Sequence, residues 1–304
     1  MHLRPPELPF MGSNAATSAA GYNAAIFGAP HGTPYPEHDN RVHAATADAL
    51  RKVLRADAEW LPNWNFDFGS PLLGESGFRL ADLGDLETQP DDGPGNRILI
   101  RDCAKAIIAA GAVPIMIGGD DSTPIPFIEA FSGHGSLIIL QIDAHIDWRE
   151  ERYGEPLGFS STMRRASEMK HVERIIQVGM RGIGSARKAE VDFARSWGAQ
   201  LITSREVLEN GIAGVLAKIP DGSRCLITLD CDALDSSVMP AVAYPTPGGL
   251  TYNDVTGLIQ GVGRKARIVG FDLIEFVPGR DPNGMATFTA AHIVSNAIGT
   301  LAKA

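Results

Sequence analysis

The chain has 304 residues, of which 44% are hydrophobic and 21% are charged, so it can bury the core of one large α/β domain or of two small ones. Its formal net charge of −9 argues against nucleic acid as a partner, because no basic stripe is present to neutralise phosphates. Three cysteines without a C-x-x-C pair, and no apolar run of about 18 residues, predict a cytoplasmic protein without a membrane span.

Short apolar runs recur along the chain and predict its strands. The runs are apolar nearly throughout instead of alternating with polar residues, which is typical of strands buried on both faces of a parallel sheet. The predicted strands are residues 24–28, 113–117, 137–142, 174–179, 200–203, 225–229 and 268–273.

Stretches with helical spacing lie between these runs. Their alternation with the strands predicts a three-layer α/β/α sandwich around a mostly parallel sheet. Ser204 and Thr251 are placed to cap two of the helices. The predicted helices are residues 42–54, 98–110, 186–197, 205–218, 252–264 and 287–301.

The chain contains no internal repeat and no long linker. Residues 21–304 are therefore predicted to form one domain, preceded by an N-terminal extension of residues 1–20. Residues 69–95 and 149–170 are the longest irregular stretches and are predicted to be functional loops. A plain nucleotide-binding domain is excluded, because residues 182–184 lack the remaining glycine of the dinucleotide fingerprint and no P-loop is present.

Acidic residues directly follow several predicted strands. Asp143, His145 and Asp147 come after residues 137–142. Residues two apart in an extended segment point the same way, so these three side chains can converge on one site. Ligands of doubly wound sheets gather at the carboxyl ends of the strands. The pattern therefore predicts a site at this edge of the sheet.

Two further acidic clusters occupy equivalent places. Asp230 and Asp232 follow residues 225–229, and Asp121 follows residues 113–117. One Asp at a strand end is typical of a helix cap or a turn, but three such clusters in one chain indicate a metal site. Carboxylates with a single imidazole favour Mn²⁺, and two divalent ions would offset the repulsion among the acids.

The amino-acid sequences of these clusters resemble the motifs of the ureohydrolase (arginase–agmatinase) family. The resemblance rests on D-A-H-I-D at 143–147, on D-C-D-A-L-D at 230–235 with P-G-G-L at 247–250, on G-G-D-D-S at 118–122 and on F-D-L-I-E-F-V-P at 271–278. It extends in order from about residue 28 to the C-terminus. It implies an arginase-like sheet of about eight strands, a homo-oligomer (trimer or hexamer), and hydrolysis of a guanidino compound to urea and an amine by a hydroxide held between two Mn²⁺ ions.

The resemblance also implies a role for each motif residue. Asp143 and Asp230 would bridge the two ions, and Asp147 would accept a proton and pass it to the leaving amine. Glu275 would accept hydrogen bonds from the planar guanidinium. The predicted metal ligands are Asp121, Asp143, His145, Asp147, Asp230 and Asp232; the predicted catalytic residues are Asp147, Glu275 and His145; the predicted substrate contacts are Glu275, Ser160, Ser161 and His31.

The sequence departs from the family pattern at two places that bear on chemistry. Asp121 stands where the family usually has histidine. If Asp121 binds a metal, Mn²⁺ remains the first choice, with Ni²⁺ or another divalent ion as the alternative. Otherwise Asp121 has lost that role and caps the following helix. The loop after Asp147 lacks the usual shuttle histidine, so Ser160 or Ser161 is expected to take its place by hydrogen bonding. His31, in a separate H-G-T run, is a further candidate for a shuttle or a substrate contact.

The motif spacing is closer to agmatinases than to arginases, so agmatine is the first substrate predicted, with putrescine as the amine product. A guanidino acid or a small guanidine is the alternative, because Arg164, Arg165 or Arg181 could donate to a carboxylate tail. A second alternative is a catalytically weakened subunit of a hetero-oligomer, suggested by the missing histidine and by Asp121.

Overall fold

An eight-stranded parallel sheet forms the centre of the computed structural model, which describes residues 3–74, 77–184 and 186–304. Every neighbouring pair among the eight strands is parallel. In spatial order the strands are β4 (Leu80–Leu86), β3 (Ala24–Ala29), β5 (Val113–Gly118), β10 (Arg267–Ile274), β9 (Arg224–Asp230), β6 (Leu137–Ile142), β7 (Val172–Met180) and β8 (Gln200–Thr203).

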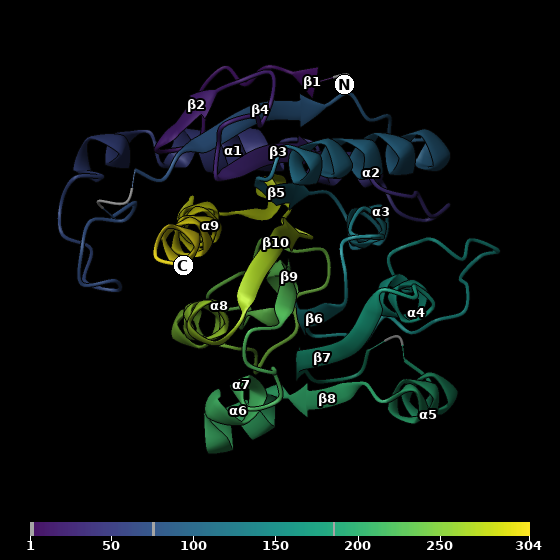
Figure 1. Cartoon of the computed structure of the whole chain (residues 1–304). Helices are drawn as coiled ribbons and strands as arrows, with labels where there is room; N and C mark the ends of the chain where they lie inside the picture. Colours follow the sequence, from purple (N-terminus) through teal and green to yellow (C-terminus); the bar gives the residue numbers. More distant parts are fainter. Residues whose placement is uncertain (1–2, 75–76, 185) are drawn as a thin grey trace.

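Helices cover both faces of this sheet, which confirms the predicted three-layer sandwich (Figure 1). Helices α1 and α6 to α9 pack in a chain of contacts over one face, and α2 to α5 cover the other. The helices are α1 (Thr46–Val53), α2 (Gly93–Ala109), α3 (Pro124–Glu129), α4 (Thr162–Ser167), α5 (Lys188–Trp197), α6 (Ser204–Asn210), α7 (Ala213–Leu216), α8 (Tyr252–Lys265) and α9 (Met285–Ala302), with the 3₁₀ turns η1 (Asn40–His43), η2 (Ala56–Trp60), η3 (Cys231–Ala233) and η4 (Pro278–Arg280).

The N-terminal segment adds two short strands beside β4. β1 (Leu3–Arg4) runs antiparallel to β4, and β2 (Ser13–Ala15) runs parallel to it. The boundary at residue 20 between extension and domain stays a prediction, and Met1 and His2 of that extension lie outside the described residues. No helix within the described ranges combines the length and apolarity that a membrane crossing needs.

Strand β4 lies inside a stretch that the sequence predicts to be a loop. It contains Asp82 and Asp85, which break the apolar pattern used to recognise the other strands. Both carboxylates are buried, because Arg51 of α1 binds them: its Nε lies 2.8 Å from Asp82 Oδ2 and its Nη1 lies 2.8 Å from Asp85 Oδ1. The loop prediction for residues 80–86 was therefore wrong because a buried ion pair replaces the apolar pattern.

Two details of the helices also differ from expectation. Thr203 rather than Ser204 caps α6, and its hydroxyl accepts a hydrogen bond from Glu206 N at 3.2 Å. The predicted helix over 205–218 is split into α6 and α7 at Gly211, whose φ is 70°. The predicted cap of α8 by Thr251 is confirmed.

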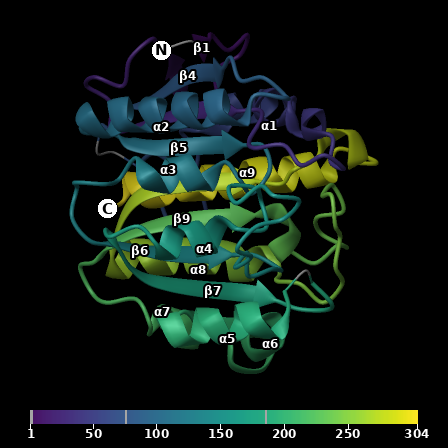
Figure 2. The same ribbon diagram turned by 90° about the vertical axis from the view of Figure 1, so that its right-hand side faces the viewer.

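The parallel strands all end at one side of the molecule, as the arrowheads of β5, β9 and β7 show (Figure 2). Strands β5, β10, β9 and β6 are consecutive neighbours in the middle of the sheet. The loops that follow these four strands therefore meet above the centre of the sheet, and they carry the acidic clusters singled out in the sequence.

Candidate metal centre

Two groups of potential metal ligands meet at this end of the sheet. The first consists of Asp143, His145 and Asp232, and the second of Asp121, Asp143 and Asp147. Within each group the ligand atoms lie within 4.8 Å of one another. Asp143 belongs to both groups, which is the position that a bridging ligand would have.

Asp230 lies at the same site but belongs to neither group. It is the last residue of β9, and its Oδ1 accepts a hydrogen bond from Asp232 N at 2.7 Å. It lines the same cavity as Asp121, Asp147 and Asp232. Its role as the second bridge stays a prediction.

A buried glutamine orients the ligands that come from β6. Gln141 Nε2 donates to Asp143 Oδ2 at 2.6 Å and to Asp147 Oδ2 at 2.8 Å. Gln141 is in turn held by Gln177 of β7, whose own Oε1 accepts from Trp148 Nε1 at 2.7 Å. Residues that do not bind a metal themselves can orient the metal ligands by hydrogen bonds of this kind. Sequence reasoning missed Gln141, although a lone polar residue in a run of apolar ones was a visible signal.

The site contains more buried carboxylates than positively charged groups. Burial raises the pKa of Asp121, Asp147 and Asp230 well above the usual range, and neighbouring carboxylates raise it further. Burial lowers the pKa of His145, but hydrogen bonds and charges from Asp143 and Asp232 outweigh it and raise that pKa to about 12. Bound cations would remove this excess of negative charge.

Asp121 provides a direct test of whether the residues fit metal ions. Both its carboxylate oxygens are buried, and neither accepts a hydrogen bond from a described N–H or hydroxyl group. The alternative that Asp121 caps the helix that follows is therefore wrong: the N-cap residue of α3 is Thr123, and no side-chain hydrogen bond caps this helix. Two buried, unpartnered oxygens beside Asp143 and Asp147 form a donor set suited to a hard divalent ion.

Two of the site residues have backbones in the left-handed region. Asp147 has φ of 50° and Glu275 has φ of 61°. Residues other than glycine adopt this region at a cost of about 1–3 kcal/mol, and such residues gather at functional sites. The tertiary structure holds both turns, since Asp147 O accepts from Arg164 N at 3.0 Å and Glu275 N donates to Gly119 O at 2.8 Å.

Glu275 stands beside the ligand groups. Its Oε1 accepts a hydrogen bond from Asp121 N at 2.9 Å, and its Oε2 lies 3.7 Å from His43 Nε2. Burial raises the pKa of Glu275 to about 7, while the charge of His43 works in the opposite direction. His43 is itself buried, and its Nδ1 lies 3.0 Å from Phe276 O. No motif in the sequence connects His43 with this site.

A cavity of about 520 Å³ opens directly above these residues. Beside the acidic floor, its walls include Arg152, Phe159, Ser160 and Tyr244. The cavity is thus acidic at its floor and of mixed chemistry at its walls. Its described lining residues are Asp121, His145, Asp147, Arg152, Phe159, Ser160, Ile183, Gly184, Asp230, Asp232, Ala243, Tyr244, Pro245, Thr246 and Glu275.

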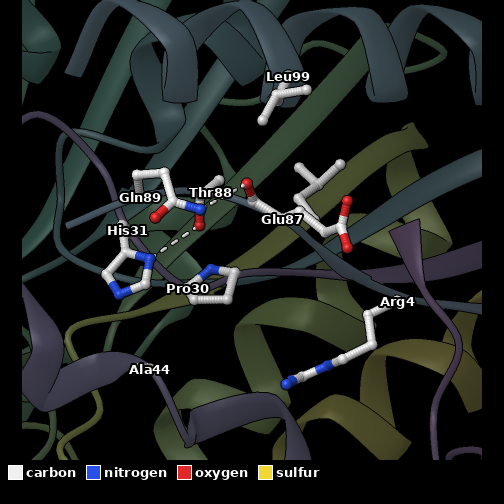
Figure 3. Close-up of a pocket in the computed structure, with 9 residues that line it drawn as sticks. Arg4, Pro30, His31, Ala44, Glu87, Thr88, Gln89 and Leu99 are labelled. Atoms are coloured by element: carbon white, nitrogen blue, oxygen red, sulfur yellow. Dashed lines mark hydrogen bonds between the residues drawn. The ribbon is translucent and has the colours of Figure 1, made fainter. Parts of the chain in front are cut away.

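The predicted substrate contacts do not all reach this cavity. Ser160 lines it, whereas the buried Ser161 does not. His31 lines a different cavity, with Arg4 and Glu87, and its Nδ1 lies 2.9 Å from Thr88 Oγ1 (Figure 3). Whether Ser161 and His31 contact substrate stays a prediction.

The three arginines proposed as tail donors are engaged elsewhere. Arg181 donates to backbone carbonyls, among them Asp232 O at 2.7 Å, and so clamps the loop after β9. Arg164 and Arg165 pair with Glu150 and Glu168 on the protein surface. The cavity is instead lined by Arg152, which sequence reasoning missed because nothing in the loop pattern predicts which arginine turns inward.

Comparison with known proteins agrees with the geometry. A model of the arginase family matches residues 22–299. The mitochondrial guanidino acid hydrolase of Homo sapiens is 27% identical over 293 residues, which cover 94% of this chain and 80% of that protein. The N(1)-aminopropylagmatine ureohydrolase of Thermus thermophilus is 34% identical over 206 residues, which cover 66% of this chain and 67% of that protein.

A solved structure supports the same assignment. Proclavaminate amidino hydrolase from Streptomyces clavuligerus superposes with a TM-score of 0.82 at 25% identity, over 99% of this chain and 98% of that one. The family match covers most of the chain, and the fold agrees along its whole length. The resemblance seen in the motifs is confirmed: this chain belongs to the arginase family of metal-dependent hydrolases.

Proposed function

We propose that this chain binds two Mn²⁺ ions, with Ni²⁺ as the alternative, and hydrolyses a linear guanidino compound to urea and an amine. The observation that carries the proposal is the pair of ligand groups sharing Asp143 at the floor of a cavity that Glu275 also lines. Asp121 and Asp147 would hold one ion and His145 and Asp232 the other, with Asp143 and Asp230 between them. When bound, two such ions lower the pKa of a coordinated water and supply the nucleophile at neutral pH.

The protein's own residues would orient the substrate and move the proton. Glu275 reaches the cavity floor, where its carboxylate matches the planar N–H pattern of a guanidinium group. Asp147 borders the same cavity and would receive a proton and return it to the departing amine. The burial of both groups excludes water and strengthens these interactions.

The guanidinium end does not by itself select a substrate. Agmatine, the first prediction from the sequence, and a guanidino acid, the alternative, would present the same group to Glu275 and differ in the tail. The named relatives include both classes: a human guanidino acid hydrolase and a bacterial ureohydrolase of aminopropylagmatine. We also propose a homo-oligomer, a trimer or hexamer, which a mass measurement in solution would test.

The rival function, a metal-poor subunit that serves another chain, is less well supported. Such a subunit would be expected to lose several ligands together, whereas Asp121, Asp143, His145, Asp147 and Asp232 converge in two groups. The missing loop histidine alone does not remove a ligand.

The test measures urea release by the purified chain after loading with Mn²⁺ or Ni²⁺. The panel contains agmatine, arginine, guanidinobutyrate, guanidinopropionate and guanidine. We expect turnover of at least one compound, its loss in Asp143→Ala, and its retention in Asp102→Ala, the same change at an exposed aspartate of α2. Silence toward the whole panel with both ions would overturn the proposal and favour the metal-poor subunit.

A further inference from the structure

One cation faces the cavity away from its acidic floor. Arg152 is the only lysine or arginine among the described lining residues, and it lies in the loop between β6 and α4. Its guanidinium is 5.6 Å from the ring centre of Tyr35 and 4.9 Å from that of Tyr153, and its Nη2 donates to Tyr153 Oη at 3.2 Å. Arg152 forms no ion pair with a carboxylate in the part of the chain that the structure describes.

The loop holds this arginine in place by a tight turn. Arg152 and Glu155 exchange two backbone hydrogen bonds, at 3.1 and 3.0 Å, around the central residues Tyr153 and Gly154. Both central residues have positive φ, 57° and 78°, which is favourable for glycine and strained for tyrosine. A hydrogen bond of 2.5 Å from Tyr153 Oη to Glu37 Oε2 holds the strained residue. The side chain is thus pre-positioned rather than free, and pre-positioning improves binding.

The charges of the cavity are separated in space. The carboxylates that line it are those of Asp121, Asp147 and Asp232, which belong to the two ligand groups, and those of Asp230 and Glu275 beside them. No other described carboxylate lines the cavity; the carboxylate of Glu37, which accepts the hydrogen bond from Tyr153, is not among the lining residues. A substrate with a cationic head at the floor would therefore meet a second cation, not an anion, at its tail.

We propose that Arg152 binds the carboxylate of the substrate, so that the enzyme acts on ω-guanidino acids in preference to agmatine. The inference rests on the proposed function, because the guanidinium must occupy the floor for the tail to reach Arg152. An arginine fork binds a carboxylate through two parallel hydrogen bonds, which gives affinity and direction together. The ammonium of agmatine would be repelled by Arg152 and would find no partner carboxylate on the described wall.

The remaining wall residues suit an alkyl chain between two charged ends. Phe159 and Tyr244 are lining residues with apolar faces. Phe159 packs against the rings of Tyr35 and His38, at 4.6 and 5.0 Å, and Tyr244 Oη lies 3.0 Å from His38 Nδ1. These contacts keep both walls fixed, and methylene groups would pack against them. Arginine also carries an α-ammonium group, which would remain without a carboxylate partner.

The experiment compares substrates that share the guanidinium group and differ in the charge at the other end. We would measure kcat/KM for 3-guanidinopropionate, 4-guanidinobutyrate and agmatine with the Mn²⁺-loaded wild type, Arg152→Gln and Arg152→Glu. Arg195→Glu, a charge reversal at an exposed residue of α5 outside the cavity, is the matched control. Calorimetric binding of the product amines, 4-aminobutyrate and putrescine, gives a readout independent of turnover, and thermal unfolding verifies that each variant is folded.

We expect the wild type to prefer a guanidino acid. Arg152→Gln should lower kcat/KM for that acid by about 10- to 100-fold, the range for a lost charge-assisted hydrogen bond, and Arg152→Glu should also raise turnover of agmatine. The control should change neither. Preference for agmatine in the wild type, unaltered in Arg152→Glu, would overturn this inference and leave the hydrolase standing. Silence toward every compound would overturn the proposed function, and this inference with it.

Discussion

Replacing Asp121 by asparagine should stabilise the metal-free protein and weaken its stabilisation by Mn²⁺. Both carboxylate oxygens of Asp121 are buried and accept no hydrogen bond from a described donor. Burial is the main cause that raises the pKa of Asp121, and the charges of Asp147 and Asp143 raise it further. A raised pKa means that stability is present below the ordinary pKa of the carboxyl and is lost as the pH rises through the folded value. Removing this ionisable group should therefore raise the free energy of unfolding at pH 7 by about 1–3 kcal/mol, the usual cost of an unsatisfied buried group.

The sign should reverse when the ion is present. A ligand at about 100 times its Kd stabilises by about 2.7 kcal/mol, and Asp121→Asn should forfeit most of this by weakening one ion's shell. The assay is denaturant unfolding of both proteins, with a chelator and then with Mn²⁺, beside the exposed control Asp102→Asn. A variant that is destabilised equally in both conditions, or that gains as much from Mn²⁺ as the wild type, would show that Asp121 is not a metal ligand.

Three further changes test other parts of the structure. Arg51→Met should lower the free energy of unfolding by about 3–5 kcal/mol, because it leaves the carboxylate of Asp82 buried without its cation, whereas Asp85 keeps its ion pair with Arg4; denaturant titration measures this. Asp272→Asn should make the protein less sensitive to alkali in thermal unfolding between pH 6 and about 9, because burial raises the pKa of Asp272 to about 8 and the wild type loses stability as the pH rises through that value; an unchanged pH profile would contradict this. His43→Ala should lower kcat/KM by about tenfold, mainly by raising KM, because His43 faces the Glu275 carboxylate. His43→Asn should recover part of this loss. If both variants lowered kcat by the same factor and left KM unchanged, His43 would have no positioning role.

The fold could be predicted where one physical signal dominated. Apolar runs bounded by Gly or Asp identified seven of the eight parallel strands, because a strand covered on both faces leaves little room for polar side chains. Strand β4 was not predicted, because it contains Asp82 and Asp85, whose charges are neutralised by Arg51, about thirty positions earlier in the sequence. Partners that distant are invisible to a local pattern.

The acidic part of the site was predictable for a related reason. Parallel strands bring their carboxyl ends to one edge, so residues that directly follow strands must gather there. The walls of the cavity followed no such rule. Arg152 reaches the cavity through a strained turn at Tyr153, and His43 reaches Glu275 from a 3₁₀ turn far earlier in the chain. Their placement depends on tertiary packing, which the sequence pattern does not encode.

Titration of the chelator-stripped chain with Mn²⁺, while urea release from a guanidino substrate is recorded, tests whether two ions support the reaction. A two-ion site with Asp143 as a shared ligand predicts no urea without added ion and a plateau near two ions per chain. Urea release before any ion is added, or full activity at one ion per chain, would show that this chain does not work through a two-ion site.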